Sequence, residues 1–498
     1  MTDHDRADTR IRRFQNLIDG GSRPAANGGW IDSIDPSTGR VWAQIPDGRA
    51  EDVDAAVAAA RRAFRGPWRQ MAAAQRAALL RKVADLVGPR VEELATIETR
   101  DNGKIIADTR AGDVPAVAQM LHYWAGAADK IHGETVQVSP QSLNYIQREP
   151  IGVVGIIVPW NSPVSVFAAK VGAALAAGNC VVVKPAETAS CSILAFVELF
   201  GQAGFPPGVV NVVAGLGAEA GDAIAGHPGI GKISFTGSTL TARAITRRSA
   251  EAIKPLSFEL GGKSANIVFA DAELEAAAIG ATTLGIFNGA AGQSCIAGSR
   301  ILLQRSIHDE MIERMVRIMR GIRLGDPMDP ASQMGPIALE RQFDKVRSYL
   351  DLGRREGGEV VFGGGAGEDL FEAGSPLARG YFVQPTLFAG LTNDARTVRE
   401  EIFGPVACVL PFDEPEEAIA IANDSTYGLA CGVWTNDLKR AHRMAAGIDA
   451  GAVWINTYRR MHWAVPFGGF KDSGYGRDSG MESLRGYQQT KSVWVDLA

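Results

Sequence analysis

Three residues in this sequence of 498 amino acids have types and settings that suit nucleophilic catalysis. Cys295 lies among small residues and glycines, in the segment from Gly292 to Arg300, just before an apolar run. A thiolate is a strong nucleophile and a good acyl leaving group, and backbone N–H groups in such a loop can point at a bound oxygen. The alternative is an inert core cysteine, which is the commonest use of a lone Cys.

Glu259 and Asn161 are the candidate partners of this cysteine. Glu259 precedes the pair Gly261-Gly262 at the junction of two series of predicted strands and helices, a position where clefts and active sites are common. A solvated glutamate in a hinge is the alternative. Asn161 ends an apolar run in a turn bounded by Pro159 and Pro163, where its amide is either an oxyanion donor or ordinary turn chemistry.

Several glycine-containing turns are candidates for nucleotide binding, although the common GxGxxG pattern is absent. The segment 215–221 has the spacing GxGxxxG, which alone is weak evidence. Phe235-Thr236-Gly237-Ser238-Thr239 follows one predicted strand and opens a helix, so it suits a phosphate or is simply an N-capped helix. Lys184-Pro185-Ala186-Glu187 ends another strand, where a carboxylate could accept from ribose hydroxyls and repel a 2′-phosphate, or form a surface ion pair.

The elements that must position these residues alternate between short apolar runs and helical patterns. Apolar residues at Val53, Val57, Ala60 and Phe64 predict one helix face, and residues 71–102 predict one or two more helices. The expected strands of the first series are Gly152–Pro159, Cys180–Lys184, Val209–Val213 and Lys232–Phe235, with helices at Val164–Ala177, Ser192–Phe200 and Gly217–Ala225. The expected strands of the second are Asn266–Phe269, Arg300–Leu303, Val406–Pro411, Cys431–Trp434 and Ala452–Ile455, with helices at Ala272–Ile286, His308–Ile322, Leu339–Leu350, Glu416–Asn423 and Leu438–Met444. This order predicts two α/β domains with parallel sheets, and the β-rich segments Asn144–Gln147 and Ser492–Val495 are candidates to pair with each other or with another subunit.

Composition excludes several classes of protein. A 46% hydrophobic and 21% charged chain is ordinary for a globular protein, and a net charge of −5 predicts no nucleic-acid partner. Five cysteines without a CxxC pair argue against a disulfide framework or a metal site and for a reducing compartment. Residues 1–13 are charged and are not a signal peptide, and Lys170 and Asn179 interrupt the most apolar stretch, so a cytoplasmic protein outside the membrane is expected.

Taken in order along the chain, eight segments resemble the NAD(P)-dependent aldehyde dehydrogenase superfamily. The segments are Pro159-Trp160-Asn161, Lys184-Pro185-Ala186-Glu187, Phe205-Pro206-Pro207-Gly208, Phe235-Thr236-Gly237-Ser238-Thr239, Glu259-Leu260-Gly261-Gly262-Lys263, Gly292-Gln293-Ser294-Cys295, Glu401-Ile402-Phe403-Gly404-Pro405 and Pro466-Phe467-Gly468-Gly469. The resemblance extends from about residue 31 to residue 496. It implies an α/β fold with a variant Rossmann cofactor domain, a catalytic domain and a small β oligomerisation arm.

The resemblance also implies the catalytic roles. Cys295 would attack the aldehyde carbonyl, the Asn161 amide and the Cys295 N–H would hold the oxyanion, and Glu259 would activate water to hydrolyse the thioester. NAD is the implied cofactor, with NADP as the alternative; Glu187 favours NAD because its charge repels a 2′-phosphate. The implied cofactor contacts are Pro159, Trp160, Lys184, Ala186, Glu187, Gly217, Gly221, Phe235, Thr236, Gly237, Ser238, Thr241, Leu260, Gly261, Glu401 and Phe403.

The substrate pocket is less familiar. Ser162 and Ala169 stand where many members of the superfamily carry aromatic residues, and residues 459–463 (Arg-Arg-Met-His-Trp) form a cationic and aromatic second wall. The expected lining residues are Ser162, Val166, Ala169, Ser294, Ile296, Arg459, Met461 and Phe467. A bulky aldehyde that bears an aromatic ring or an acid group is therefore expected, unless the arginines face solvent or another subunit.

The resemblance divides the chain as follows: 1–125 and 149–258 form the cofactor-binding domain, 259–456 the catalytic domain, 457–479 a returning segment, and 126–148 with 480–498 the oligomerisation arm. A homodimer or homotetramer is implied, bridged by Ser142–Gln147 and Gly486–Val495. Two other functions stay open: a CoA-acylating semialdehyde dehydrogenase, which would generally lack the water-activating Glu259, and a catalytically silent protein on the same fold, against which Asn161, Glu259 and Cys295 argue together.

Overall fold

The computed structural model describes residues 11–498; the first ten residues of the expected cofactor domain, and most of the charged segment 1–13, lie outside the described part. The first of two large sheets has eight strands in the order β22-β12-β11-β8-β9-β10-β2-β3. Its five central strands are parallel, and β22 and β2 add to the two sides in antiparallel fashion. The bounds are β22 (Gly474–Tyr475), β12 (Leu256–Glu259), β11 (Lys232–Thr236), β8 (Val153–Ile157), β9 (Cys180–Lys184), β10 (Val210–Val212), β2 (Asn16–Ile18) and β3 (Gly21–Arg23).

Helices pack on this sheet because each carries an apolar face. In α1 the predicted stripe is confirmed: Val53, Val57 and Ala60 are buried and Phe64 is partly buried. Residues 71–102 form two helices, α3 and α4, whereas the buried helix α6 was not predicted. The helices are α1 (Ala50–Arg65), α2 (Pro67–Gln70), α3 (Ala73–Val87), α4 (Val91–Asn102), α5 (Ile106–Asp108), α6 (Val114–Ala127), α7 (Pro163–Ala176), α8 (Cys191–Phe196), α9 (Glu198–Ala203), α10 (Asp222–Gly226) and α11 (Thr239–Ser249).

The second sheet has seven strands in the order β15-β16-β17-β14-β13-β19-β20, all parallel except the edge strand β15. The strands are β15 (Glu359–Phe362), β16 (Thr386–Ala389), β17 (Val406–Phe412), β14 (Arg300–Gln304), β13 (Ala265–Val268), β19 (Ala430–Trp434) and β20 (Ala452–Ile455). The helices are α12 (Leu274–Ala281), α13 (His308–Arg320), α14 (Glu340–Arg355), α15 (Arg396–Arg399), α16 (Pro415–Asn423) and α17 (Leu438–Gly447). The two parallel α/β units predicted from the sequence are thus present.

Three predicted helices differ from the structure. The helix expected over Ser192–Phe200 is divided at Val197 into α8 and α9. The other two are replaced in part by turns. The helix expected over Ala272–Ile286 ends at Ala281, because Gly280 lies against the indole of Trp434 and the backbone leaves the helical region at Thr282. The helix expected over Gly217–Ala225 is a π-turn, Gly217–Gly221, followed by the short α10. In both places an apolar, small-residue composition does not distinguish a long helix from a buried turn.

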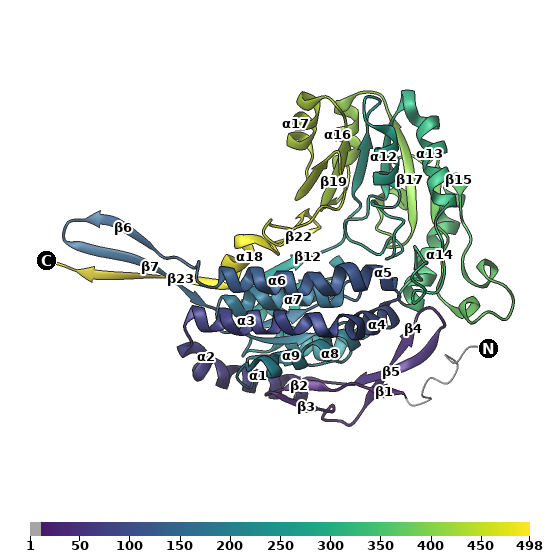
Figure 1. The fold of residues 1–498 in the computed structure, drawn as a ribbon. Helices are drawn as coiled ribbons and strands as arrows, with labels where there is room; N and C mark the ends of the chain where they lie inside the picture. Colours follow the sequence, from purple (N-terminus) through teal and green to yellow (C-terminus); the bar gives the residue numbers. More distant parts are fainter. Residues whose placement is uncertain (1–10) are drawn as a thin grey trace.

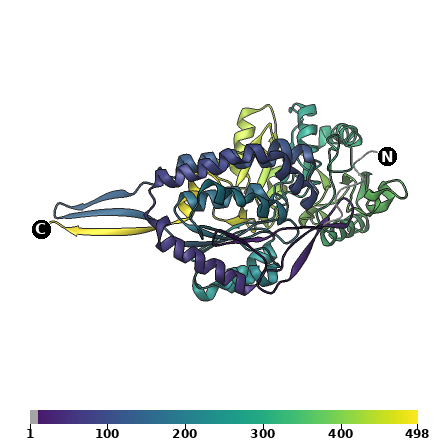
Figure 2. The same ribbon diagram turned by 60° about the horizontal axis from the view of Figure 1, so that its bottom comes forward.

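A three-stranded sheet in the order β23-β7-β6 extends away from the rest of the molecule, with the C-terminus at its tip (Figures 1 and 2). Its strands are β6 (Glu134–Ser139), β7 (Ser142–Pro150) and β23 (Gln488–Asp496), and α18 (Gly480–Gly486) leads into it. The two β-rich segments therefore pair with each other, as Trp494 opposite Asn144 shows. Smaller pairings complete the fold: β1 (Arg12–Arg13), β5 (Arg40–Pro46) and β4 (Trp30–Asp35) form one sheet, and β18 (Tyr427–Gly428) pairs with β21 (Phe470–Lys471).

A short connection joins a strand of the first sheet to a strand of the second sheet at Glu259, one of the candidate catalytic residues. Glu259 ends β12 of the first sheet, and β13 of the second sheet begins only six residues later, at Ala265. In Figure 1, β12 and β22, at one edge of the first sheet, lie on the side that faces the second α/β unit. None of the helices in residues 11–498 combines the length and the apolar composition of a membrane span, and no group of three or more His, Cys, Asp or Glu side chains in these residues is arranged to hold a metal ion.

Candidate functional site

Cys295 lies in a turn before β14 and differs from the other cysteines in its exposure. Within the described chain all five cysteines are free; Cys295 is partly exposed, and the other four are buried in strands or at the start of α8. The turn is held by close packing: a Cβ at Gly292 (φ +69°) would meet the carbonyl oxygen of Gly404 at 2.3 Å, so this position needs glycine. A Cβ at Gly262 would meet the carbonyl oxygen of Cys295 at 2.4 Å.

Asn161 lies between β8 and α7 and points toward this turn. Its Nδ2 donates a 2.9 Å hydrogen bond to the backbone carbonyl of Gln293, two residues before Cys295. This bond occupies one hydrogen of the Asn161 Nδ2 group and thereby fixes the direction of the other hydrogen. The backbone N–H of Cys295 donates to no backbone carbonyl among the described residues, so it is a second donor in this turn without a backbone partner.

Glu259 is buried at the end of β12, and its Oε2 has no hydrogen-bond partner. Burial and the nearby Asp478 carboxylate raise the pKa of Glu259 well above its usual value, against the opposing charges of Lys170 and Arg477. Lys170 forms a buried ion pair with Asp478 at 2.7 Å. The carboxyl is therefore a base whose proton affinity is increased by its surroundings.

The Cys295 thiol is surrounded by more negative than positive charge. Burial, and then Glu401 and Glu259, raise the pKa of Cys295 to about 12, while Arg459 lowers it. The thiolate assumed from the sequence is thus a minor species in the protein alone. A cationic group bound beside the sulfur would shift this balance toward the thiolate.

Glu401 lies directly against the Gly261-Gly262 turn. Its Oε1 accepts a 2.9 Å hydrogen bond from the backbone N–H of Gly262, and a Cβ at Gly261 would meet Glu401 Oε2 at 2.4 Å. The ring of Phe403 packs edge-on against Trp160, with centroids 5.2 Å apart. Two expected cofactor contacts, Glu401 and Phe403, line one small cavity together with Ser294. Two more, Gly261 and Trp160, lie beside it, against Glu401 and Phe403 respectively.

Two residues that the sequence did not single out fix this group from α14. Gln342 Nε2 donates to the backbone carbonyls of Ile402 and Phe403, at 2.8 and 2.9 Å. Lys345 Nζ donates to the backbone carbonyl of Glu401 at 2.7 Å. The only feature of the sequence that could have indicated these two residues is their spacing of three positions, which places them on one face of the helix.

Lys184 and Glu187 form an ion pair of 2.6 Å at the end of β9. Lys184 is buried and Glu187 partly exposed, so one carboxylate oxygen of Glu187 stays open to a ligand. Burial opposes ionisation of Glu187, but Lys184 outweighs it and holds the pKa of this carboxyl below its usual value; Arg341 acts in the same direction. A charged carboxylate at this position suits hydroxyl donors.

The turn after β11 is an N-terminal helix cap, as one of the two sequence readings predicted. Ser238 Oγ accepts from the backbone N–H of Thr241 at 3.1 Å, while the buried Thr236 Oγ1 has no partner. A Cβ at Gly217 or Gly221, in the π-turn, would meet nothing within 4 Å. The remaining expected contacts lie at strand ends or in turns: Pro159 follows β8, Ala186 follows β9, Phe235 is in β11, Gly237 follows β11 and Leu260 follows β12.

The expected substrate residues come from both halves of the molecule. Val166 packs against the core of the first α/β unit, whereas Ile296, Phe467 and Cys295 belong to or pack against a core cluster of the second. Ser162 and Ala169 are partly exposed on or before α7, and Ser162 Oγ accepts a hydrogen bond from Lys104. Arg459 is partly exposed with φ +57°, and Met461 is 55% exposed.

The chain is similar in sequence and in structure to known aldehyde dehydrogenases. The model of the "Aldehyde dehydrogenase family" matches residues 23–493. The chain is 44% identical to aldehyde dehydrogenase family 2 member C4 of Arabidopsis thaliana, over 98% of this chain and 96% of that protein. Its structure is similar to an aldehyde dehydrogenase of Bacillus cereus solved as an NAD+ complex (TM-score 0.94, 44% identity, 98% and 97% of the two chains). It is equally similar to PnpE from Pseudomonas sp. WBC-3 (TM-score 0.94, 47% identity, 97% and 98%).

Proposed function

The chain belongs to the aldehyde dehydrogenase family, and from this premise we propose that it oxidises an aldehyde to the carboxylic acid with NAD. One observation carries the proposal: the Asn161 amide is hydrogen bonded to the backbone carbonyl of Gln293, two residues before the partly exposed thiol Cys295, while Glu259 keeps a buried carboxylate oxygen without a partner. A nucleophile, an oxyanion donor and a base are the three groups that the reaction requires.

The reaction begins at Cys295. Its thiolate Sγ bonds to the aldehyde carbon, and the carbonyl electron pair moves to the oxygen, where Asn161 Nδ2 and the Cys295 N–H stabilise the negative charge. Such donors are worth roughly 3–4 kcal/mol each in the transition state. After loss of hydride the acyl group remains on Sγ as a thioester. Water then attacks this carbon, its proton passes to Glu259, and Cys295 leaves as the thiolate.

NAD, when bound, supplies the hydride acceptor, and the residues around the cleft fit it. The open oxygen of Glu187 suits ribose hydroxyls, the unpartnered Thr236 Oγ1 and the capped start of α11 suit a pyrophosphate, and the uncrowded Gly217 and Gly221 leave room for a base. Glu401 and Phe403 would hold the nicotinamide riboside. The charge of Glu187 favours NAD over NADP, because a 2′-phosphate would face a carboxylate.

For the substrate we propose an aldehyde that carries an acid group. The support is Arg459, which forms no ion pair within 4 Å among the described residues, and whose charge lowers the pKa of Cys295. Its neighbour Tyr458 is hydrogen bonded to Ile296, directly after Cys295. An arginine so placed suits a substrate carboxylate.

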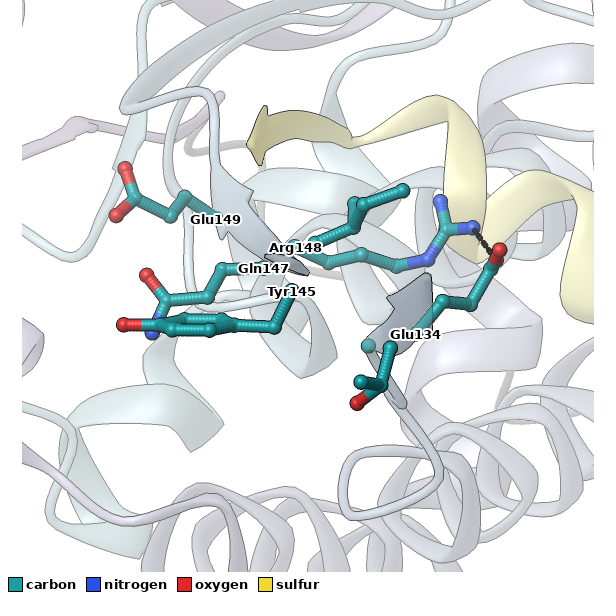
Figure 3. Close-up of a pocket in the computed structure, with 8 residues that line it drawn as sticks. Glu134, Tyr145, Gln147, Arg148 and Glu149 are labelled. Atoms are coloured by element: carbon teal, nitrogen blue, oxygen red, sulfur yellow. Dashed lines mark hydrogen bonds and ion pairs between the residues drawn. The ribbon is translucent and has the colours of Figure 1, made fainter. Parts of the chain in front are cut away.

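We also propose the domain division 1–125 with 149–258, 259–456 with the returning segment 457–479, and an arm of 126–148 with 480–498. The arm is proposed to join copies of the chain, because Val138, Trp494 and Leu497 on or beside it are 54%, 60% and 59% exposed. A hollow at the arm is lined by Tyr145, Gln147 and Glu149 on one face of β7, with Arg148 paired to Glu134 at 3.4 Å (Figure 3).

Five free cysteines support a reducing compartment such as the cytoplasm.

The decisive experiment measures NADH formation with a panel of aldehydes in the wild type and in Cys295→Ala. We expect aldehyde-dependent NADH formation that falls by about 10⁴-fold or more in the variant, while NAD binding by calorimetry stays the same. Cys408→Ala, at a buried cysteine in β17, is the matched control. Turnover retained in Cys295→Ala would refute the proposal.

A further inference from the structure

The end of α4 is hydrogen bonded to both chain neighbours of Asn161. Asn102 Nδ2 donates to the backbone carbonyl of Trp160 at 3.3 Å. Lys104 Nζ donates to Ser162 Oγ at 3.2 Å. Asn102 and Lys104 are themselves joined, since Asn102 Oδ1 accepts from the Lys104 backbone N–H at 3.0 Å. The turn Asn102-Gly103-Lys104 thus contacts the segment 160–162 on both sides of Asn161.

This turn has little freedom to move. Gly103 has φ +79°, and a Cβ there would meet Pro36 Cγ and Pro336 Cγ, each at 2.8 Å. Both a left-handed backbone and close packing on two proline rings therefore require glycine at this position.

The Lys104 ammonium is fixed by charge as well as by packing. Lys104 is 6% exposed and forms an ion pair with Asp113 at 2.5 Å. Burial disfavours its charge, but Asp113 and the buried Glu98 outweigh burial and raise the pKa of Lys104. Ser165 Oγ donates to the backbone carbonyl of Asp113 at 3.3 Å, so α7 is joined to the same cluster. A protonated Nζ has three hydrogens, and Asp113 and Ser162 accept two of them.

We propose that Lys104 is a positioning residue for the oxyanion-binding amide of Asn161, acting through the hydroxyl of Ser162. This inference rests on the proposed function. Because Gln293 takes one hydrogen of Asn161 Nδ2, a small rotation of the segment 160–162 would turn the second hydrogen away from the substrate oxygen. A displacement of about 1 Å in a catalytic group can cost about 10²-fold in rate. A phenylalanine or tryptophan at position 162 could not accept the bond, so the device depends on the serine of this chain.

Ser162→Thr and Ser162→Val form a matched pair for the test, because the two side chains are nearly equal in shape and only threonine keeps a hydroxyl. With benzaldehyde and NAD we expect the kcat of Ser162→Val to be about 10- to 100-fold below that of Ser162→Thr. The KM for NAD should be unchanged in both. Equal kcat values for Thr and Val would overturn the inference.

Two backgrounds separate positioning from direct contact with the substrate. In the Lys104→Met background the difference in kcat between Ser162→Thr and Ser162→Val should vanish, because the donor to the hydroxyl is gone. The same difference should vanish in the Asn161→Ala background. That variant keeps Lys104 in place, so it can be used if Lys104→Met fails to fold. A difference that persists in Asn161→Ala would mean that the hydroxyl acts on the substrate itself, and would overturn the inference. Lys82→Met, at an exposed lysine of α3, is the control for loss of a lysine.

Folding and the proposed function need separate readouts. Alkylation of Cys295 by iodoacetamide requires no oxyanion donor, so its rate should be the same in both Ser162 variants; a slower rate in Val alone would indicate a structural effect and contradict the inference. A wild-type kcat in Asn161→Ala would refute the oxyanion role of Asn161 in the proposed function, whereas the function as a whole is tested by Cys295→Ala. Loss of turnover in Asn161→Ala, together with equal kcat values for Ser162→Thr and Ser162→Val in the otherwise wild-type chain, would refute only the role of Lys104.

Discussion

The hydroxyl of Tyr458 donates a 3.0 Å hydrogen bond to the backbone carbonyl of Ile296, the residue that follows Cys295. Tyr458 is 3% exposed, and its ring lies 4.9 Å from that of Trp454. Gly298 and Gly432 leave the space that it fills, since a Cβ at either would meet the tyrosine at 2.9 and 2.5 Å. The returning segment therefore fixes the turn that carries the nucleophile.

Tyr458→Phe should destabilise the protein and slow the reaction. The change leaves a buried carbonyl without its donor, which costs about 1–3 kcal/mol, and frees the Cys295 turn to move. We expect a lower midpoint of denaturation and a lower kcat, with an unchanged KM for NAD. Tyr475→Phe, at a half-exposed tyrosine of β22, should have neither effect; equal kcat in Tyr458→Phe and wild type would contradict the link.

Much of the fold was predictable because buried parallel strands are continuous apolar runs. Cys180–Lys184 coincides with β9, and Val406–Pro411 with most of β17. Most of the larger strands that were missed lie where this signal is weak: β12 is only half buried, β15 is partly exposed, and β4 mixes polar and apolar residues. The strand β16 was missed although it is fully buried. Packing against neighbours decides these segments, and their own composition does not.

The site was predictable as a set of motif residues, but its supporting contacts were not. Lys104 and Ser162 are 58 positions apart, Gln342 and Ile402 are 60 apart, and Tyr458 and Ile296 are 162 apart. Each pair is a hydrogen bond between separate elements, and such bonds leave no local pattern. The pKa of Cys295 is likewise a property of the assembled charges of Glu401, Glu259 and Arg459.

Arg459→Ala should change substrate preference as well as reactivity. Its charge lowers the pKa of Cys295, so its removal raises that pKa, reduces the thiolate fraction and slows all aldehydes equally. A contact with a substrate carboxylate would add a further loss for acidic aldehydes alone. We expect kcat/KM for 4-carboxybenzaldehyde to fall about 10-fold more than for benzaldehyde.

The control for this measurement is Arg460→Ala, since Arg460 is exposed and does not act on Cys295. It should leave the ratio of the two kcat/KM values unchanged. If Arg459→Ala slowed both substrates by the same factor, the carboxylate contact would be excluded and only the electrostatic effect on the thiol would remain.

Glu259→Gln should stop the reaction at the thioester. A glutamine cannot take the proton of the attacking water, so a burst of about one NADH per site should precede turnover slowed by about 10²–10⁴-fold. In the wild type the base must be ionised, and burial with Asp478 raises its pKa; deacylation should therefore increase with pH until that pKa is passed. Stopped-flow absorbance across pH 6–10 checks both points, and a variant without a burst, or with the wild-type pH limb, would contradict the role.

Gly261→Ala should weaken cofactor binding. The added Cβ would meet Glu401 Oε2 at 2.4 Å, with backbone torsions that alanine can adopt, so the carboxylate must move. We expect the KM for NAD to rise about 10-fold, measured with the aldehyde at saturation. Gly201→Ala in α9, where a Cβ would meet nothing within 4 Å, is the matched control, and an unchanged KM in Gly261→Ala would argue against Glu401 as a cofactor contact.

Removal of residues 486–498 should dissociate the proposed oligomer. The deletion takes away β23, whose nine residues pair with β7 along its whole length, and it removes the exposed Trp494 and Leu497. Strand β7 would then present an unpaired edge, and the surface proposed to join two copies would be lost. Light scattering coupled to size exclusion should report a smaller particle than the full chain, whereas deletion of residues 497–498 alone, which keeps β23 intact, should not. An assembly of unchanged size after the longer deletion would mean that the subunits meet elsewhere, because β23 and its exposed side chains would no longer be present.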